Sequence, residues 1–160
     1  MSYIQKDLLD GERIVYTGKL HWCIFFPAFF YMLLSIFLLQ LAHKSGMPAF
    51  ILLGGVASLY AFMQLIKAFV IKLSTELAVT NKRVIFKKGL ISRDTMELNH
   101  SKIESIVEDQ SIIGRIFNYG TLVIQGTGGG KEYLRNIANP LTFKKQAQSA
   151  ADTVSNPAKP

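Results

Sequence analysis

Two uncharged stretches separated by a short turn constrain this chain more than any other feature. Residues 22–42 and 49–66 contain no Lys, Arg, Asp or Glu. A helix needs about 20 apolar residues to cross the hydrocarbon core of a bilayer. A helix in water would need a polar face, and neither stretch supplies one. We therefore predict a transmembrane helical hairpin over residues 21–71, with spans at about 22–42 and 49–71.

The residues around the two spans predict their orientation. The turn between them contains a single Lys or Arg, Lys44, and Ser45-Gly46-Met47-Pro48 interrupts the helix there. Three basic residues precede the first span, and six follow the end of the second uncharged stretch: Lys67, Lys72, Lys82, Arg83, Lys87 and Lys88. Because Lys and Arg concentrate on the cytoplasmic side, we expect a multi-pass membrane protein with both termini in the cytoplasm.

Small residues recur four apart in the second span. Gly54 and Ser58 form one such pair, and Ala57 and Ala61 form another. This spacing lets two helix backbones approach closely in a membrane. Two interpretations remain open: the residues pack the two helices of this hairpin together, which we favour, or they contact a second copy or another membrane protein.

The remaining chain predicts a cytoplasmic leader at 1–20, one small domain at 72–151 and a disordered tail at 152–160. Short β-rich runs, separated by turn residues, predict strands within 75–80, 83–87, 90–99, 102–109 and on both sides of a glycine-rich turn in 121–137. Ser111 is placed to cap a short helical turn, and Asn139-Pro140 to open a terminal helix. Six strands and one helix favour a small β-sandwich or partly open barrel closed by that helix.

The segment "TNKRVIFKKGLISRDTMELNHSKIESIVEDQSIIGRIFNYGTLVI", preceded by a membrane hairpin and followed by a proline-initiated helix, resembles the bacterial PH-domain-like membrane proteins of the YdbS-like family. The leader "GERIVYTGKLHW" also fits that family. The resemblance implies a PH-like domain of two antiparallel sheets with a C-terminal capping helix. It also implies seven strands, so either residues 14–17 supply one or a short strand elsewhere completes the set. It transfers no catalytic or ligand-binding residue.

Motifs for catalysis or cofactors are not found in the sequence. The run "GTGGGKE" resembles a phosphate-binding loop, but Gln125 and Glu132 stand where that loop needs Gly and Ser or Thr. His21, His43 and His100 lack metal-ligand spacing, and Cys23 is the only cysteine. We therefore expect a protein that is not an enzyme and that has no cofactor and no metal site.

A group of basic residues near the second span is the candidate lipid surface: Lys82, Arg83, Lys87, Lys88 and Arg93. Near an anionic leaflet each such charge contributes about 1 kcal/mol. Three interpretations stay open, namely that these charges only set the topology, that they contact anionic headgroups in general, or that they bind one specific headgroup. We do not expect nucleic acid as a partner despite a pI near 9.6, because no recognition motif accompanies the charge.

These observations favour a non-enzymatic integral membrane protein that presents a cytoplasmic PH-like binding or scaffold module at the membrane surface. Its expected partners are anionic lipids, a membrane protein or a second copy of the chain. The resemblance to the YdbS-like family adds a link to envelope stress or tolerance of membrane-active peptides. The alternative is an accessory subunit of a larger membrane transport or export complex.

Overall fold

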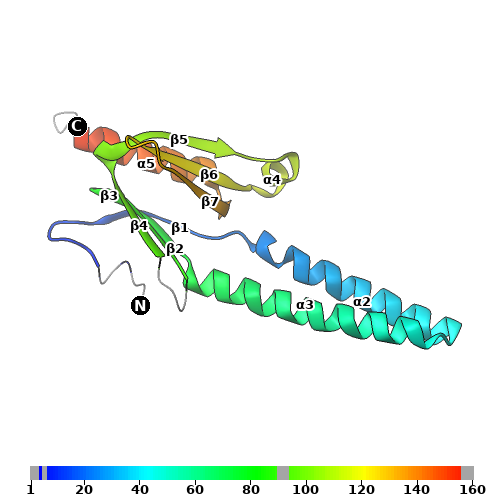
Figure 1. Ribbon diagram of the computed structural model, residues 1–160. Helices are drawn as coiled ribbons and strands as arrows, with labels where there is room; N and C mark the ends of the chain where they lie inside the picture. The colour runs from blue at the N-terminus through cyan, green and yellow to red at the C-terminus, as the bar shows by residue number, and fades with distance from the viewer. Residues whose placement is uncertain (1–3, 5–6, 90–93, 156–160) are drawn as a thin grey trace. The chain divides into compact units, whose positions relative to one another are not determined.

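The computed structural model describes residue 4, residues 7–89 and residues 94–155 (Figure 1). The chain folds as two compact units. One is helical and comprises Trp22–Lys72, and the other is β-rich and combines Met1–His21 with Leu73–Pro160. The β-rich unit is therefore discontinuous in sequence, with the helical unit inserted into it.

The helical unit consists of a short 3₁₀ turn, η1 (Trp22–Phe25), followed by α2 (Phe26–Ser45) and α3 (Pro48–Ser74). Gly46 ends α2 in the left-handed conformation, with φ of 65°, and its N–H donates to Ala42 O at 2.9 Å. Pro48 begins α3, where its fixed φ suits the first helical turn. By length and composition both Trp22–Ser45 and Pro48–Ser74 can cross a membrane, which confirms the two predicted apolar helices.

The β-rich unit contains two antiparallel sheets and a C-terminal helix, as predicted. The first sheet has the order β1-β2-β3-β4 and is built from β1 (Ile14–Gly18), β2 (Glu76–Thr80), β3 (Arg83–Lys88) and β4 (Asp94–Asn99). The second has the order β5-β6-β7 and is built from β5 (Ile103–Asp109), β6 (Tyr119–Gly126) and β7 (Lys131–Ala138). Two short helices, η2 (His100–Lys102) and α4 (Ile112–Phe117), connect the strands, and α5 (Pro140–Ser155) follows them.

The expected leader supplies a strand, so our count of six strands was one short. β1 pairs antiparallel with β2, and Gly18 lies opposite Leu77. Gly18 is needed at this position because a Cβ there would lie 2.7 Å from Leu77 Cδ2 and 3.0 Å from the Phe143 ring. The whole helical unit separates β1 from its partner in sequence, and local hairpin signals therefore give no sign of this pairing.

The core of the β-rich unit lies between the two sheets and α5. Phe143, Ala147 and Ala150 on α5 are buried. They pack with apolar side chains of both sheets, including Leu77, Val84, Ile106, Leu122 and Leu134. The helix continues through Ser155, so residues 152–155 are helical where we expected a disordered tail. Residues 156–160 of that predicted tail lie outside the described residues.

The first sheet is covered on its other face as well. Ile4 from the N-terminal segment is buried there with Ala78 and Ile85, and Ile14 packs against this second cluster. Four consecutive residues of β2, Leu77 to Thr80, are consequently buried on alternate faces. The N-terminal segment thus forms part of the domain, in addition to leading to the first apolar helix.

Candidate functional site

A seam of small residues joins α2 to α3. The buried residues of α2 are Ala28, Ser35 and Ala42, and those of α3 are Gly54, Ala61 and Ala68. Each set recurs every seven residues, the period at which two helices can stay in contact along a shared seam. Ser35 Oγ donates to Gly54 O at 2.9 Å. A Cβ at Gly54 would lie 2.9 Å from Leu39 Cδ2, so a larger residue there would displace the Leu39 side chain.

This seam differs from the predicted helix-packing set. Gly54 and Ala61 face α2, whereas Ala57 is only half-buried and Ser58 is exposed, with its hydroxyl donating to Gly55 O at 2.8 Å. The four-residue spacing therefore identified two seam residues and two that lie beside the seam. The contribution of α2 was missed, although small residues recurring every seven positions among large apolar ones could have indicated it.

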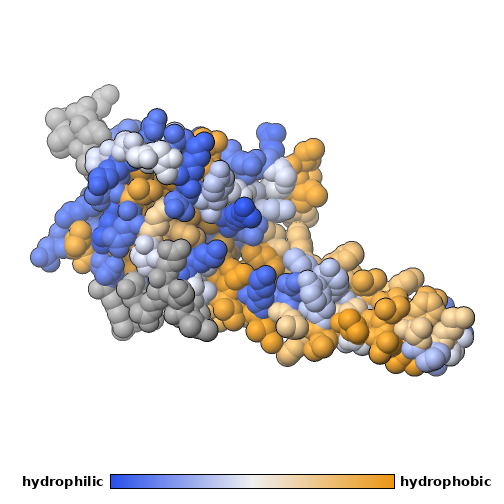
Figure 2. Space-filling model, viewed as in Figure 1, coloured by the Kyte–Doolittle hydropathy of each residue, from blue (hydrophilic) through white to orange (hydrophobic). Residues whose placement is uncertain are grey.

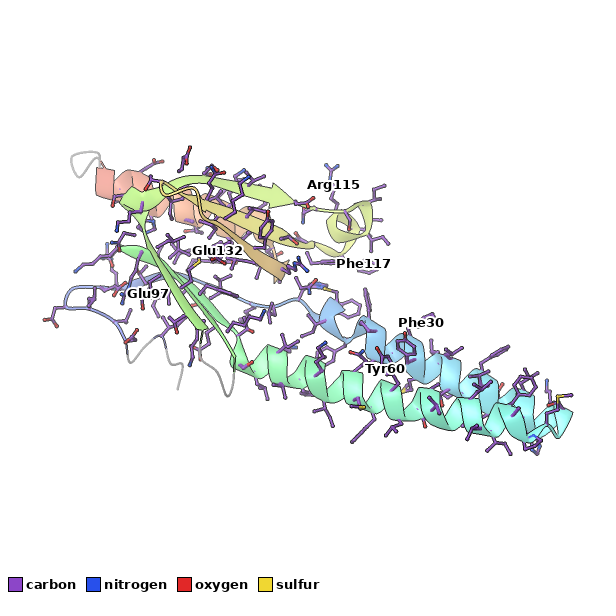
Figure 3. The ribbon with its side chains drawn as sticks, viewed as in Figure 1. Phe30, Tyr60, Glu97, Arg115, Phe117 and Glu132 are labelled. Carbon is purple, nitrogen blue, oxygen red and sulfur yellow. The ribbon has the colours of Figure 1, made fainter. Side chains whose placement is uncertain are left out.

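Aromatic and apolar side chains cover the remaining surface of the helical unit. Tyr31 and Tyr60 pack edge to face with ring centroids 4.5 Å apart, and Figure 3 labels Tyr60 on α3 and Phe30 on α2. An open apolar groove of about 630 Å³ runs between the helices and includes Phe29, Met32 and Phe62 in its lining. Such a surface suits contact with lipid chains or with another apolar helix.

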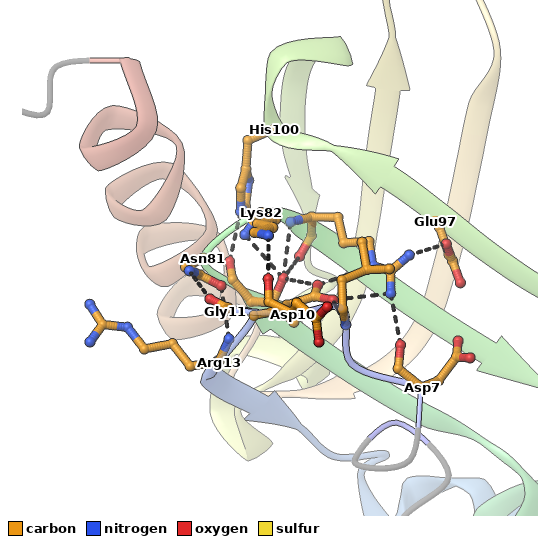
Figure 4. Close-up of polar contacts among 12 residues, drawn as sticks. Asp7, Asp10, Gly11, Arg13, Asn81, Lys82, Glu97 and His100 are labelled. Atoms are coloured by element: carbon orange, nitrogen blue, oxygen red, sulfur yellow. Dashed lines mark hydrogen bonds and ion pairs between the residues drawn. The ribbon is translucent and has the colours of Figure 1, made fainter.

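Arg83 of the predicted basic group lies inside the β-rich unit. It is 8% exposed, and its guanidinium pairs with the carboxylates of Glu12 and Glu97 (Figure 4). Nε lies 3.0 Å from Glu12 Oε1, and a terminal nitrogen also donates to Asp7 O at 3.0 Å. Arg83 therefore ties the N-terminal segment to the sheet, and its charge is already matched by two carboxylates.

Glu12 is the counterpart of Arg83 in this cluster. Its carboxylate accepts hydrogen bonds from Leu9 N at 2.8 Å and from Thr80 Oγ1 at 2.7 Å, and its side chain is fully buried. Burial alone would raise the pKa of Glu12. The hydrogen bonds from Leu9, Thr80 and Arg83, together with the charge of Arg83, outweigh burial and lower the pKa below its ordinary value.

Asn81 and Lys82 extend this attachment of the N-terminal segment, here called the clasp and comprising Asp7–Arg13 with the β2–β3 turn. Asn81 Oδ1 accepts from Arg13 N at 2.9 Å, and Asn81 Nδ2 donates to Gly11 O at 3.1 Å. Lys82 is exposed and its ammonium donates to Asp10 O at 2.8 Å (Figure 4). The clasp explains why "GER" and "TNKR" occur in one chain: their polar groups bond to each other.

The other basic residues do not gather into one patch with Lys82. Lys87 and Lys88 lie at the opposite end of β3 from the β2–β3 turn. Lys87 lies five positions after Lys82, so their Cα atoms are about 16 Å apart at a rise of roughly 3.3 Å per residue. Arg93 lies outside the described residues. The structure therefore places Lys87 and Lys88 at one end of β3, on opposite faces of the strand, and Lys82 beyond its other end.

A polar cavity of about 410 Å³ lies where η2 and β5 meet α5. It is bordered by His100, Glu104 and Asp152. His100 is buried, and because its Nε2 lies 2.8 Å from the Thr80 carbonyl oxygen, Nε2 carries the proton. Among the described residues no group of three or more His, Cys, Asp or Glu is arranged to hold a metal ion.

The glycine-rich run forms the turn between β6 and β7. Gly126 N donates to Gly130 O at 3.0 Å, and Gly129 has a φ of 78°. A strand, β7, follows this turn in place of the helix that a phosphate-binding loop requires. The run is therefore a hairpin turn and not a phosphate-binding loop, in agreement with the mismatches to that motif at Gln125 and Glu132.

An apolar surface on α4 was missed in the sequence. Its four large side chains are exposed: Ile112 by 82%, Ile113 by 56%, Ile116 by 73% and Phe117 by 46%. In Figure 2 hydrophobic side chains gather over α4, and Figure 3 shows Arg115 and Phe117 projecting from it in different directions. The capping motif of this helix predicted its position, but an isolated six-residue helix gives no periodicity from which to tell its outer face.

Comparison with known protein families matches residues 28–158 of the chain to the bacterial PH domain. Because this match covers most of the sequence, the chain belongs to the bacterial PH domain family. The YdbS-like assignment within that relationship stays a prediction. No curated protein sequence and no solved structure matches the chain.

Proposed function

We propose that this protein is a non-enzymatic, membrane-anchored binding module whose PH-like domain is held at the cytoplasmic face of the bacterial inner membrane. One observation carries the proposal: the two membrane-capable helices are inserted in the sequence between β1 and β2, which pair with each other.

The pairing of β1 with β2 restricts where the helices can go. Gly18 lies opposite Leu77, so the chain leaves the sheet and returns to it at the same end of two adjacent strands. Only Lys19 to His21 connect β1 to η1, and only Thr75 connects α3 to β2. A single span would leave these connections on opposite sides of a bilayer. Two antiparallel spans bring both ends of the hairpin back to one side.

The charge distribution supports the cytoplasmic side for the domain. Lys6, Arg13 and Lys19 precede the first span, and Lys67 with Lys72 begins the basic stretch at the end of the second. The turn between the spans has Lys44 alone. This asymmetry is the pattern that keeps flanking segments in the cytoplasm. A multi-pass topology with both termini inside follows.

The binding activity in this proposal involves the membrane surface itself. Lys82, Lys87 and Lys88 stay on the list of lipid contacts because they are exposed or half-exposed, whereas Arg83 is removed from it by its ion pairs. Contacts of these lysines with anionic headgroups would be general and salt-sensitive. A link to envelope stress or tolerance of membrane-active peptides belongs to the same proposal and depends on the family resemblance alone.

The alternative function, an accessory subunit of a transport or export complex, needs a free contact surface on the hairpin. Gly54 is engaged with Ser35 and Leu39 of α2 and does not provide it. The open apolar groove beside Phe29 and Phe62 does offer such a surface. Ser58 also lines this groove. The alternative therefore predicts that a second membrane protein co-purifies in mild detergent and that replacing Ser58 by Leu abolishes this co-purification.

Cysteine accessibility tests the proposed topology. In a Cys23→Ala background, Met47→Cys places a thiol in the turn between the spans and Thr127→Cys places one at the exposed β6–β7 tip. We expect a membrane-impermeant maleimide to label Met47→Cys in spheroplasts and Thr127→Cys only in inside-out vesicles. Labelling of both positions from the same side would refute the topology. Release of the chain from membranes by alkaline carbonate would refute membrane insertion.

A further inference from the structure

The six residues of α4 present four large apolar side chains to solvent and only one charged side chain, Arg115. Soluble domains rarely expose contiguous apolar surface unless it contacts a partner or a membrane. The segment Ser111–Asn118 contains no Asp or Glu. An acidic residue would be repelled by an anionic leaflet, whereas Arg115 would be attracted to it.

The local structure holds these side chains outward. Gly114 is the residue of α4 that faces the domain, where a Cβ would lie 2.5 Å from Tyr119 O. Ser111 Oγ accepts from Gly114 N at 3.0 Å and caps the helix, and Asn118 ends it with a φ of 58°. Gly114 is thus the side of α4 that packs against the chain. The side chains of Ile112, Ile113 and Ile116 point away from it, and no described residue covers them.

Within the β-rich unit, α4 contacts the residue that directly precedes the first apolar helix in the sequence. His21 precedes η1 directly, and its ring stacks on Tyr119 with centroids 5.0 Å apart. His21 N donates to Asn136 O at 2.7 Å, and its ring is hydrogen-bonded to the backbone of Phe117. The C-terminal end of α4 is therefore bonded to the last residue before the first apolar helix.

We infer that α4 is an interfacial membrane anchor, with Ile112, Ile113, Ile116 and Phe117 inserted among the lipids of the leaflet at which the first span begins. The inference rests on the proposed membrane insertion of the hairpin. The layer between water and the hydrocarbon core is about 5–7 Å thick on each side. A helix about 9 Å long that is bonded to a residue at that boundary reaches the layer.

A lipid surface fits this patch better than a protein does. Standard protein interfaces bury about 800 Å² on each partner, which six residues cannot supply. Interfacial segments, in contrast, act by inserting a few large apolar side chains beside cationic ones. The patch has that composition, and the adjoining span would keep it at the membrane at all times, so weak insertion is sufficient.

An environment-sensitive fluorophore tests the inference in the full chain. In a Cys23→Ala background, the label is attached at Ile113→Cys or, as a matched control, at Thr127→Cys on the exposed β6–β7 tip. The proteins are reconstituted in nanodiscs of phosphatidylcholine and phosphatidylglycerol that contain doxyl lipids with the quencher near the headgroup or near the chain end. The variant Ile113→Cys with Ile112→Gln and Ile116→Gln is measured in parallel.

We expect blue-shifted emission at position 113, quenched at least twofold more by the shallow doxyl lipid than by the deep one, and water-like emission at position 127. The two Gln substitutions should return the emission at 113 towards that of the control. Water-like emission at 113 in the parent would overturn the inference. Blue-shifted emission without quenching by either lipid would also overturn it, because a second copy or another protein would then cover the patch.

Carbonate extraction of membranes that contain the chain, combined with the fluorescence result, separates this inference from the proposed function. If the chain stays in membranes after carbonate treatment while the label at position 113 shows water-like emission, only the proposed α4 anchor is refuted. If the chain is released by carbonate, the topology fails and the anchor fails with it. Far-ultraviolet circular dichroism of the Gln variant, matched to the parent, checks that the overall fold is retained when the blue shift is lost.

Discussion

The helical unit and the β-rich unit are each stabilised internally, but by opposite kinds of packing. In the helical unit large apolar side chains face outward and the buried residues are small, with Gly54, Ser35 and Ala61 in the seam. In the β-rich unit the large side chains are inside, Phe143 and Leu122 among them, and charged residues also enter the interior at Glu12 and Arg83. A unit that apolar lipid surrounds gains stability from close backbone contact, whereas one in water gains it from buried apolar area.

This contrast predicts that the β-rich unit folds without the helical one. We expect replacement of Trp22–Lys72 by a Gly-Ser linker of about eight residues to give a soluble protein, because Gly18 and Leu77 already lie opposite each other. Two-dimensional NMR should show dispersed amide signals. A control that begins at Lys72, and so lacks β1 and the clasp, should be unfolded or aggregated. Solubility of both proteins would show that β1 and the clasp are dispensable.

Arg83→Ala should cause the next largest effect and should be confined to the β-rich unit. Removing one partner of a buried ion pair costs about 3–5 kcal/mol, because the other charge stays buried, and Glu12 would be that charge. Hydrogen exchange of the full chain in nanodiscs should accelerate in β2 and β3 and stay unchanged in α2 and α3. Lys82→Ala, an exposed neighbour in the same turn, should have little effect. Equal acceleration in both variants would contradict a specific role for the ion pair.

Adjacent glycines offer a matched pair for the helical unit. Gly54→Leu should lower the free energy of unfolding of the helical unit by about 1–3 kcal/mol, the usual cost of overpacking. The reason is that a Cβ at this position meets Leu39 at 2.9 Å. Gly55→Leu should be neutral or stabilising, since a Cβ at Gly55 meets nothing within 4 Å. Thermal unfolding in one fixed detergent compares the two variants. A similar loss for both would mean that the seam does not depend on close approach at Gly54.

The clasp should also make the β-rich unit sensitive to acid. The pKa of Glu12 is lowered in the folded chain relative to 4.5, so its contribution to stability is fully present above about pH 4.5. That contribution is lost as the pH falls through the lower folded pKa, because the unfolded chain binds the proton first. Urea unfolding between pH 7 and pH 3 should show a decline that Glu12→Gln reduces. An unchanged pH profile in Glu12→Gln would assign the decline to other carboxylates.

The smallest effect is expected for the surface lysines. In the linker-joined β-rich unit, Lys87→Glu with Lys88→Glu should weaken binding to phosphatidylglycerol vesicles, because each charge contributes about 1 kcal/mol near an anionic leaflet. Sedimentation at rising salt measures the change, and neutral phosphatidylcholine vesicles are the control. Lys82→Glu, at the far end of β3, should weaken binding less. Unchanged binding in the double variant would leave these lysines only a role in topology.

The two units also differ in how much of each is predictable from sequence. The two helices of the helical unit follow from the length of residues 22–42 and 49–66 and from the absence of charge in them. In the β-rich unit local signals sufficed for the Asn81-Lys82 turn, the Ser111 cap and the start of α5 at Pro140. They failed where the partner is distant, as for β1, and where a bulge between Ile103 and Ser105 shifts the pairing of β5.

For the candidate lipid surface, the sequence lists the basic residues but does not show how they are arranged, and their contact with lipid stays a prediction. A sequence lists charges without their partners, so Arg83 looked as exposed as Lys82 until Glu12, 71 residues away, was placed beside it. The α4 surface shows the reverse problem. Ile112, Ile113 and Ile116 look like core residues, and only the inward turn of Gly114 shows that they are outside.

The separation of β1 from β2 has a consequence for synthesis of the protein. Between Gly18 and Leu77 the ribosome adds 59 residues, which takes roughly 3–12 s at about 5–20 residues per second. During that interval β1 has no neighbouring strand to pair with, because β2 is made only after both apolar helices. The first sheet can therefore close only after the whole helical unit has been synthesised, so the β-rich unit is never complete before the two apolar helices exist.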